Sequence, residues 1–258
     1  MTTELPGALA HDGYAGYAGW KGWDGAFTAS DREARYFAAE FRGVALSGKR
    51  LLEVGFGNGS LLAWARSQGA RVSGLEHDAG MCEAGRRAGF DVAGTSLVEL
   101  ANRGERYDLV VAFDVLEHWD GTELVANFAA VRTLLAEGGL FVARFPNGQS
   151  PFGRVYQHGD FSHKSTLSTY KIEYLARLGG LDVVRIANAC RVSARAGMLA
   201  ALRQRWLALR RRRIERRTAR LYGIRRLPLD PNLVAVLRRP AGDTMAGQPD
   251  GATEQERE

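Results

Sequence analysis

The stretch LLEVGFGNGSLL, residues 51–62, runs from an apolar strand-like segment through three glycines into an apolar helical segment. Gly55, Gly57 and Gly59 allow the backbone to turn tightly and to approach a ligand closely. The helix that follows points unpaired backbone N–H groups at whatever binds there. The stretch therefore predicts a ligand-binding turn between a strand and a helix, with a purely structural turn as the alternative.

An acidic residue stands at the end of the next expected strand. Glu76 closes the segment ARVSGLE, residues 70–76, and follows Gly59 by seventeen residues. At that place a carboxylate can accept hydrogen bonds from both hydroxyls of a ribose. The glycine turn and the acid together predict a nucleoside ligand. An NAD-binding turn requires a glycine at position 60, where this chain has Ser60, so the pattern disfavours NAD.

Short apolar strands alternate with helical segments along most of the chain. This alternation is typical of an α/β fold, in which helices cover both faces of a parallel sheet. The last two strands lack the helical pattern of the earlier connections and predict a terminal antiparallel pair. Ser30 and Glu33 have capping-box spacing, which predicts a helix over about residues 30–43. The expected strands are 50–55, 70–76, 90–95, 107–115, 139–145, 181–188 and 232–238, and the other expected helices lie near 60–68, 79–88, 122–136 and 169–178.

The composition describes an ordinary globular protein. Of its 258 residues, 45% are hydrophobic and 25% are charged, which excludes a disordered or collagen-like chain. Cys82 and Cys190 lie far apart without CxxC spacing, so we expect neither a disulfide framework nor a thiolate metal cluster. No apolar run approaches the roughly 20 residues that cross a bilayer. We therefore expect a cytoplasmic protein that is bound, at most, to the inner face of the membrane.

Composition also divides the chain into regions. Residues 1–28 are rich in glycine and aromatic residues and predict an irregular arm. Residues 29–240 predict one folded domain that carries a basic helical insertion at 193–228. Residues 241–258 lack apolar periodicity and predict a disordered tail.

Three motifs, in order and at normal spacing, carry a resemblance to a known family. They are LLEVGFGNG at 51–59, YDLVVAFDVLEHWD at 107–120 and LLAEGGLFVARFPN at 134–147. From about Lys49 to Leu181 the chain resembles the class I S-adenosylmethionine-dependent methyltransferases, most closely the subgroup whose fourth strand ends in D-V-L-E-H. The resemblance implies a doubly wound, Rossmann-like sheet of order 3-2-1-4-5-7-6 with strand 7 antiparallel. It also implies S-adenosylmethionine as the cofactor.

The resemblance further implies where each part of the cofactor would lie. The glycine turn would hold the methionine half, the strand-end acid would bind the ribose, and the end of the fourth strand would close the pocket. The aromatic residues of the arm (Tyr14, Tyr17, Trp20 and Trp23) would fold over this pocket, although such residues can also simply cover the edge of a core. The implied cofactor residues are Glu53, Gly55, Gly57 and Gly59 for the methionine half, Glu76 for the ribose, His77, Ser96 and Leu97 around the adenine, and Phe113, Asp114 and Val115 at the closing edge.

Methyl transfer from a sulfonium needs an aligned acceptor and, when the acceptor is a hydroxyl, a base that removes its proton. His118 follows the fourth strand, and His163 lies in the loop HGDFSHKS (158–165), where Asp160 can orient its imidazole. The family has a comparable D-x-[ST]-H segment, which favours this loop as a wall of the active site. The alternatives are structural: His118 can cap the strand, and Asp160 with His163 can pin the loop. No set of histidines and carboxylates has clear metal-ligand spacing, so we expect no metal.

The absence of certain motifs narrows the choice of methyl acceptor. The fourth strand ends in F-D-V-L, whereas enzymes that methylate amino groups of nucleic-acid bases usually show N-P-P-Y or D-P-P-Y, and neither cysteine lies in a motif for methylation of a base carbon. We therefore expect methylation of an oxygen on a glycan, a glycolipid or another small biosynthetic intermediate, with a histidine as general base. The alternatives are an RNA methyltransferase and a non-catalytic scaffold that binds the cofactor.

The positive charge of the chain comes from one segment. Residues 191–226 hold thirteen arginines against the single acid Glu215, so the rest of the chain carries a net negative charge although the total is +6. Residues 197–223 predict a helix at the rim of the active site with Leu199, Leu202, Trp206 and Leu209 on one face. This helix suits contact with an anionic membrane surface or an anionic glycan, contact with RNA, or packing of its leucine face on the domain.

Overall fold

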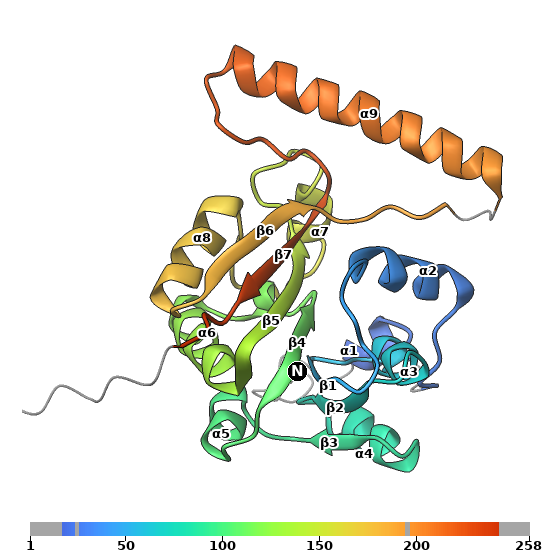
Figure 1. Cartoon of the computed structure of the whole chain (residues 1–258), viewed down its shortest axis with the longest axis vertical. Helices are drawn as coiled ribbons and strands as arrows, with labels where there is room; N and C mark the ends of the chain where they lie inside the picture. The colour runs from blue at the N-terminus through green and yellow to red at the C-terminus, as the bar shows by residue number, and fades with distance from the viewer. Residues whose placement is uncertain (1–16, 24–25, 194–196, 243–258) are drawn as a thin grey trace, which may run out of the picture.

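The computed structural model describes residues 17–23, 26–193 and 197–242, and the remaining residues, including Tyr14 and most of the expected tail, lie outside the described residues. The fold is one seven-stranded sheet with the order β3-β2-β1-β4-β5-β7-β6 (Figure 1). β7 pairs antiparallel with both β5 and β6, whereas the other neighbouring strands pair in parallel. The predicted doubly wound α/β sheet, its strand order and its antiparallel strand are therefore confirmed.

The strands begin and end close to the predicted residues. β5 differs most, because it begins four residues before its expected start: Leu135 already pairs with Tyr107, and the register then shifts before Leu140 pairs with Leu109. The strands are β1 (Arg50–Val54), β2 (Arg71–Leu75), β3 (Asp91–Ala93), β4 (Tyr107–Phe113), β5 (Leu135–Pro146), β6 (Asp182–Asn188) and β7 (Asn232–Arg238).

Four helices confirm predictions: α3 (Ser60–Ser67), α4 (Ala79–Arg87), α6 (Gly121–Leu134) and α8 (Thr169–Leu178). The helix expected over 30–43 is α2 (Asp31–Glu40), which Ser30 caps and which ends earlier than predicted. Short elements that were not predicted are α5 (Leu97–Asn102), α7 (Arg154–His158) and the 3₁₀ turn η1 (Leu116–His118). The expectation of a wholly irregular arm is wrong at α1 (Tyr17–Trp20), which forms one helical turn.

Helices cover both faces of the central strands. Successive strand residues point to opposite faces. Leu51 accordingly packs with Phe37 and Trp64 from α2 and α3, whereas its neighbour Leu52 packs in the cluster that contains Phe128 of α6. Both leucines are fully buried. This double burial explains why the strands of this sheet read as continuous apolar runs.

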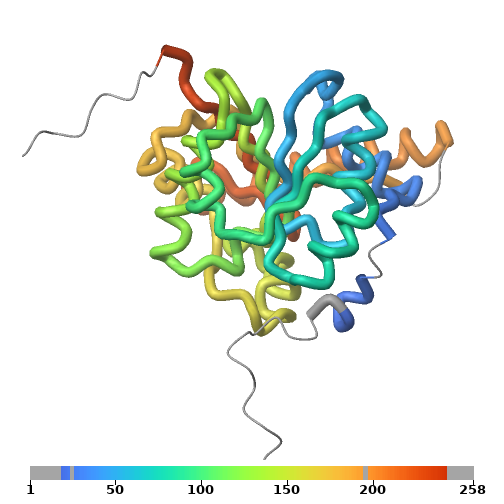
Figure 2. The backbone as a smooth tube through the Cα atoms, turned by 90° about the horizontal axis from the view of Figure 1, so that it is seen from below, coloured from blue at the N-terminus to red at the C-terminus, as the bar shows by residue number. Residues whose placement is uncertain are grey.

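The predicted basic helix is α9 (Met198–Leu221), and it stands apart from the sheet (Figure 1). It lies at the end of the sheet to which β4 and β5 point. Figures 1 and 2 agree that the start of α9 projects beyond the body on the side of α2. Glu215 anchors the helix, because its Oε1 accepts hydrogen bonds from Asn188 Nδ2 (2.7 Å) and from the backbone N–H of Leu229 (2.8 Å). Among the described residues, no helix combines the length and the hydropathy needed to span a membrane.

Candidate active site

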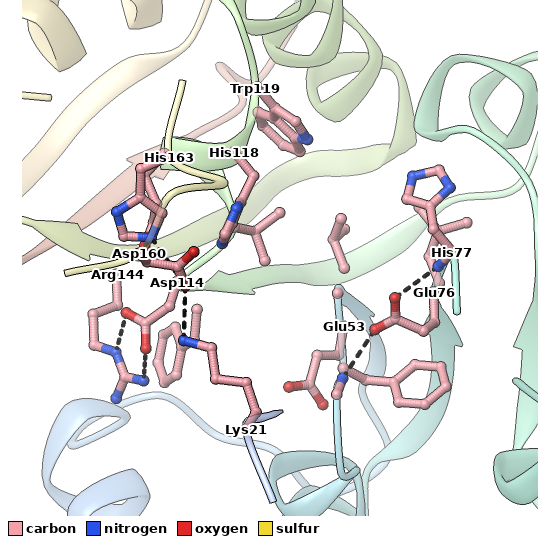
Figure 3. A pocket seen from close by; sticks show the side chains of 18 of the residues that line it. Lys21, Glu53, Glu76, His77, Asp114, His118, Trp119, Arg144, Asp160 and His163 are labelled. Atoms are coloured by element: carbon pink, nitrogen blue, oxygen red, sulfur yellow. Dashed lines mark hydrogen bonds and ion pairs between the residues drawn. The ribbon is translucent and has the colours of Figure 1, made fainter. Parts of the chain in front are cut away.

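A cavity of about 870 Å³ opens where β1, β2, β4 and β5 end, as expected for a ligand site in an open α/β sheet. It brings together residues from the glycine turn, the ends of β2 and β4, and the loop after β5 (Figure 3). Every residue that the sequence placed in the cofactor or catalytic site lines this cavity except Gly59. The lining residues among those predictions are Glu53, Gly55, Gly57, Glu76, His77, Ser96, Leu97, Phe113, Asp114, Val115, His118, Asp160 and His163.

The glycine turn has the backbone that its sequence predicts. Gly55, Gly57 and Gly59 have φ values of 65°, 52° and 72°, a region that residues with a Cβ rarely adopt. A Cβ on Gly55 would lie 2.6 Å from a methyl carbon of Val115, and one on Gly57 would lie 2.9 Å from the ring of Trp23. Gly59 instead starts α3 and packs against a phenylalanine of the arm. Gly55 and Gly57 therefore shape the cavity, whereas Gly59 supports the turn on the side away from the cavity, against Phe27.

Two carboxylates flank the turn. Glu76 accepts hydrogen bonds at Oε2 from the N–H of Gly57 (3.0 Å) and at Oε1 from the N–H groups of His77 (2.7 Å) and Asp78 (3.2 Å). Glu53 is buried, and its Oε2 has no hydrogen-bond partner among the described residues. Burial, together with the nearby charge of Glu76, raises the pKa of Glu53 well above its ordinary value.

These carboxylates fit the groups of S-adenosylmethionine. A buried carboxylate oxygen without a partner, as at Glu53, suits a cationic ligand group such as the ammonium of the methionine half. A carboxylate fixed at a strand end by backbone N–H groups, as at Glu76, suits a pair of ribose hydroxyls. His77 is exposed beside it, while Ser96 caps α5 by accepting a hydrogen bond from Glu99 N (3.1 Å). The residues present could therefore hold the cofactor.

Asp114 closes the end of β4 in a strained backbone conformation. Its φ is 57°, unusual for a residue other than glycine, and its carboxylate forms a two-point ion pair with Arg144 of β5, whose Nε lies 2.9 Å from Oδ1. Although burial opposes the charge, Asp114 raises the pKa of Arg144 above its usual value. The guanidinium also lies over the rings of Phe113 and Tyr36. Sequence reasoning missed Arg144, although an arginine inside the apolar strand FVARF is a signal that could have found it.

The two predicted histidines lie side by side at the other end of the cavity (Figure 3). The ring centroids of His118 and His163 are 4.8 Å apart at an interplanar angle of 76°. His163 Nδ1 lies 3.1 Å from the carbonyl oxygen of Gln157, which can only accept, so Nδ1 donates and, in the neutral ring, Nε2 is the acceptor. Nε2 lies 3.8 Å from Asp160 Oδ2, so the two residues are neighbours at a separation too long for a hydrogen bond.

A hydrogen-bonded chain fixes His118 in the same way. The Ser162 hydroxyl donates to Asp160 Oδ1 and lies 3.1 Å from His118 Nδ1. Because the serine hydrogen is used on the carboxylate, Nδ1 donates to the serine oxygen and Nε2 is again the acceptor. Burial, with a further contribution from His163, lowers the pKa of His118 to about 4. His118 is therefore neutral near pH 7.

Two further residues complete this cluster, and sequence reasoning missed both. Glu117 is buried, its Oε1 lies 3.9 Å from His163 Nε2, and burial raises its pKa well above the ordinary value. Lys21 of the arm pairs with Asp160 Oδ2 at 3.0 Å. Among the described residues, Glu117, His118 and His163 could hold a metal ion, since each offers one ligand atom and these atoms lie within 4.8 Å of one another. Glu117 and His118 are adjacent, but His163 lies 45 residues further along the chain, so short spacing could not join it to them.

The described part of the arm lines the cavity. Trp20, Lys21 and Trp23 all line it, and Trp23 lies against the glycine turn. The side chain of Tyr17 lies outside the described residues. Phe27 fixes the following segment to the domain, because it is buried in a cluster with Phe56 and Phe90. The arm thus reaches from the cofactor turn to the histidine cluster.

Comparisons with known proteins show the family and the fold of the chain. Residues 29–184 match a protein-family model described as a methyltransferase domain. A search of curated proteins found no match. An S-adenosylmethionine-dependent methyltransferase from Archaeoglobus fulgidus is similar in structure, with a TM-score of 0.58 and 17% identity over 80% of this chain and 94% of that chain. A second, from Mesorhizobium loti, has a TM-score of 0.55 and 18% identity over 80% of this chain and 98% of that chain. A third, from Clostridium acetobutylicum, has a TM-score of 0.54 and 12% identity over 81% of this chain and 91% of that chain.

Proposed function

Because the chain belongs to the class I S-adenosylmethionine-dependent methyltransferases, we propose that it methylates an oxygen of a small biosynthetic intermediate, glycan or glycolipid. Enzymes of this class (EC 2.1.1.-) take the methyl group from the sulfonium of S-adenosylmethionine. The observation that carries the proposal is the pair of histidines, buried His118 and half-buried His163, whose rings lie in the cavity that also holds the cofactor residues. A hydroxyl acceptor needs such a base, because its proton must leave during methyl transfer.

Within this proposal each cofactor residue binds a different part of S-adenosylmethionine. Glu53 would bind the ammonium group, the turn at Gly55 and Gly57 would cradle the methionine half, and Glu76 would bind the ribose hydroxyls. The adenine would lie among His77, Ser96 and Leu97. Phe113, Asp114 and Val115 would form the wall between cofactor and acceptor, and Gly59 would act indirectly by supporting the turn.

His163 is the better candidate for the base. Its Nε2 lies 3.8 Å from the carboxylate of Asp160, which would stabilise the imidazolium formed by proton uptake. His118, whose pKa of about 4 makes it a weak base, would bind and orient the acceptor hydroxyl. Asp160 would position the ring of His118 through Ser162, while the Gln157 carbonyl holds the ring of His163.

The test measures release of S-adenosylhomocysteine by the purified protein with a panel of hydroxyl acceptors. Wild-type turnover should persist in a chelator, and His163→Ala should abolish it while leaving cofactor affinity unchanged. His158→Ala is the matched control, because His158 is an exposed histidine at the end of α7. Turnover that stops in chelator and returns with a divalent ion would assign the cluster to a metal and refute the histidine base. Cofactor binding without turnover on any acceptor would favour a scaffold.

The acceptor class agrees with the surroundings of the cavity. A glycolipid stands at a membrane surface, and the basic helix α9 lies at the same end of the sheet as the cavity (Figure 1). Cys82 and Cys190 are both free thiols, which suits a reducing compartment. The proposal therefore includes a cytoplasmic location, at the inner face of the membrane when the acceptor is lipid-linked.

A further inference from the structure

The helix α9 presents an apolar stripe to solvent. Leu199, Leu202, Trp206 and Leu209 are 80%, 53%, 53% and 58% exposed, although large apolar side chains on a helix normally face a core. At about 100° per residue, these four positions fall within an arc of about 80°. They therefore form one continuous face along the first half of the helix.

The opposite side of α9 faces the body of the protein. Gln204, Arg211 and Glu215 are half-buried and Ala219 is buried, and these positions centre roughly opposite the apolar stripe. The two hydrogen bonds of Glu215 fix this orientation. The expectation that the leucine face packs on the domain is therefore wrong: the polar side of the helix faces the domain, and the apolar stripe faces away from it.

Arginines continue the same outward face along the second half of the helix. Arg210, Arg213, Arg217 and Arg220 fall in nearly the same arc as the apolar stripe, and all four are exposed. Arg210 also lies over the ring of Trp206, 4.7 Å from its centroid. The whole helix holds nine arginines and one acid. Its outward face, which we call the docking face, therefore joins an apolar half, residues 199–209, to a strongly basic half, residues 210–220.

We propose that the docking face binds the surface of an anionic lipid bilayer. Leucine and tryptophan side chains can enter the boundary between headgroups and acyl chains, where an apolar body is removed from water. Arginine guanidinium groups can pair with lipid phosphates in a two-point geometry, and an anionic surface attracts each of them further. The combination on one face suits a bilayer because the bilayer offers both environments side by side.

The other possible occupants fit only half of this face. An RNA strand would satisfy the arginines, but Leu199, Leu202 and Leu209 would gain no base-reading or phosphate contact. A second copy of the chain would cover the leucines, but it would bring two helices of nine arginines each against one another. Docking on a bilayer does not depend on the atom that is methylated, so it goes beyond the proposed reaction.

Vesicle flotation of the full chain tests this proposal. The protein should float with vesicles of phosphatidylcholine mixed with phosphatidylglycerol, and not with phosphatidylcholine alone. Arg213→Gln/Arg217→Gln should weaken binding roughly 30-fold, because each arginine near an anionic surface contributes about fivefold. Leu202→Gln/Trp206→Gln should also weaken it by more than about tenfold. The matched control is Arg103→Gln/Arg106→Gln, which removes two exposed charges just before β4, at the opposite end of the sheet, and should bind as the wild type does.

Unchanged S-adenosylmethionine affinity and melting temperature establish that each variant is folded. The proposal is overturned if the wild type fails to float with the mixed vesicles, or if both double variants bind as well as the control. Salt-sensitive binding to single-stranded RNA in place of vesicles would assign the face to RNA. A dimer that Leu202→Gln/Trp206→Gln dissociates would assign it to a second copy. None of these outcomes changes the result of the methyl-transfer assay, so failure here is distinct from failure of the proposed reaction.

Discussion

Replacing Glu76 by glutamine tests the cofactor site at its most defined point. The carboxylate accepts hydrogen bonds from the backbone N–H groups of Gly57, His77 and Asp78, and it lines the cavity where the ribose is proposed to bind. Glutamine keeps the size of the side chain but removes its charge and turns one acceptor into a donor. A donor placed against these N–H groups loses a hydrogen bond, and the ribose hydroxyls then meet a neutral amide in place of a charged carboxylate.

The magnitude follows from the bonds involved. A hydrogen bond to a charged group contributes about 1.5–3 kcal/mol and a neutral one about 0.5–1.5 kcal/mol, so each ribose hydroxyl loses about 1 kcal/mol. Two hydroxyls give about 2 kcal/mol, which corresponds to about a 30-fold increase in Kd. Calorimetric titration with S-adenosylmethionine and S-adenosylhomocysteine should show this increase for both ligands, because both carry the ribose.

Two controls make the result specific to the ribose. Glu83→Gln removes an exposed carboxylate in the neighbouring helix α4, where it pairs with Arg87, and it should leave Kd unchanged. A 2′-deoxy analogue should bind the wild type more weakly than S-adenosylhomocysteine does, but the Glu76→Gln variant should discriminate less between the two. A change in Kd below about threefold, or equal discrimination by both proteins, would refute the assignment of Glu76 to the ribose.

Further predictions concern stability. The raised pKa of Glu53 means that the folded protein keeps this proton longer than the unfolded chain, so stability falls as pH rises through the folded pKa. Glu53→Gln should therefore gain in melting temperature over the wild type toward alkaline pH, and a pH-independent difference would contradict this. Gly59→Ala should lower the free energy of unfolding, measured in urea, by several kcal/mol, because its Cβ would meet the ring of Phe27. The control Gly43→Ala, at φ 85° in open space, should lower it by only about 1–2 kcal/mol. Equal losses would show that the contact with Phe27 is unimportant. Asp114→Asn should lower the free energy of unfolding in urea by about 1–2 kcal/mol. This is less than the loss of a fully buried ion pair, because the Asp114 side chain is 45% exposed. An unchanged unfolding midpoint would show that the pair with Arg144 adds nothing to stability.

The sheet could be predicted because its signal is local. Each central strand is buried on both faces and therefore reads as an apolar run, and β7 and α8 begin and end where predicted. The shortest helices, α5 and α7, could not be found by periodicity, since six and five residues do not complete two helical turns. The direction of α9 also escaped prediction. Its leucines predict an amphipathic helix, but only the anchor at Glu215 shows which side faces the domain.

The candidate site was predictable only in part, for a related reason. The glycine turn and Glu76 belong to one strand–turn–helix–strand unit, so sequence spacing places them together. Glu117, Lys21 and Arg144 come from a 3₁₀ turn, the arm and β5, and only the folded chain brings them to the cavity. A rule that looks for metal or catalytic groups at short spacing finds Asp160 with His163 and cannot find a buried glutamate from another element.

The arm connects the two ends of the cavity. Trp23 lies against Gly57 in the cofactor turn, while Lys21, two residues earlier, pairs with Asp160. Asp160 in turn accepts a hydrogen bond from the Ser162 hydroxyl, whose oxygen contacts His118 Nδ1. The described part of the arm thus contacts both the cofactor turn and the carboxylate beside the histidines, whereas α9 lines a separate surface, and this is why the methyl-transfer test and the vesicle test can fail independently.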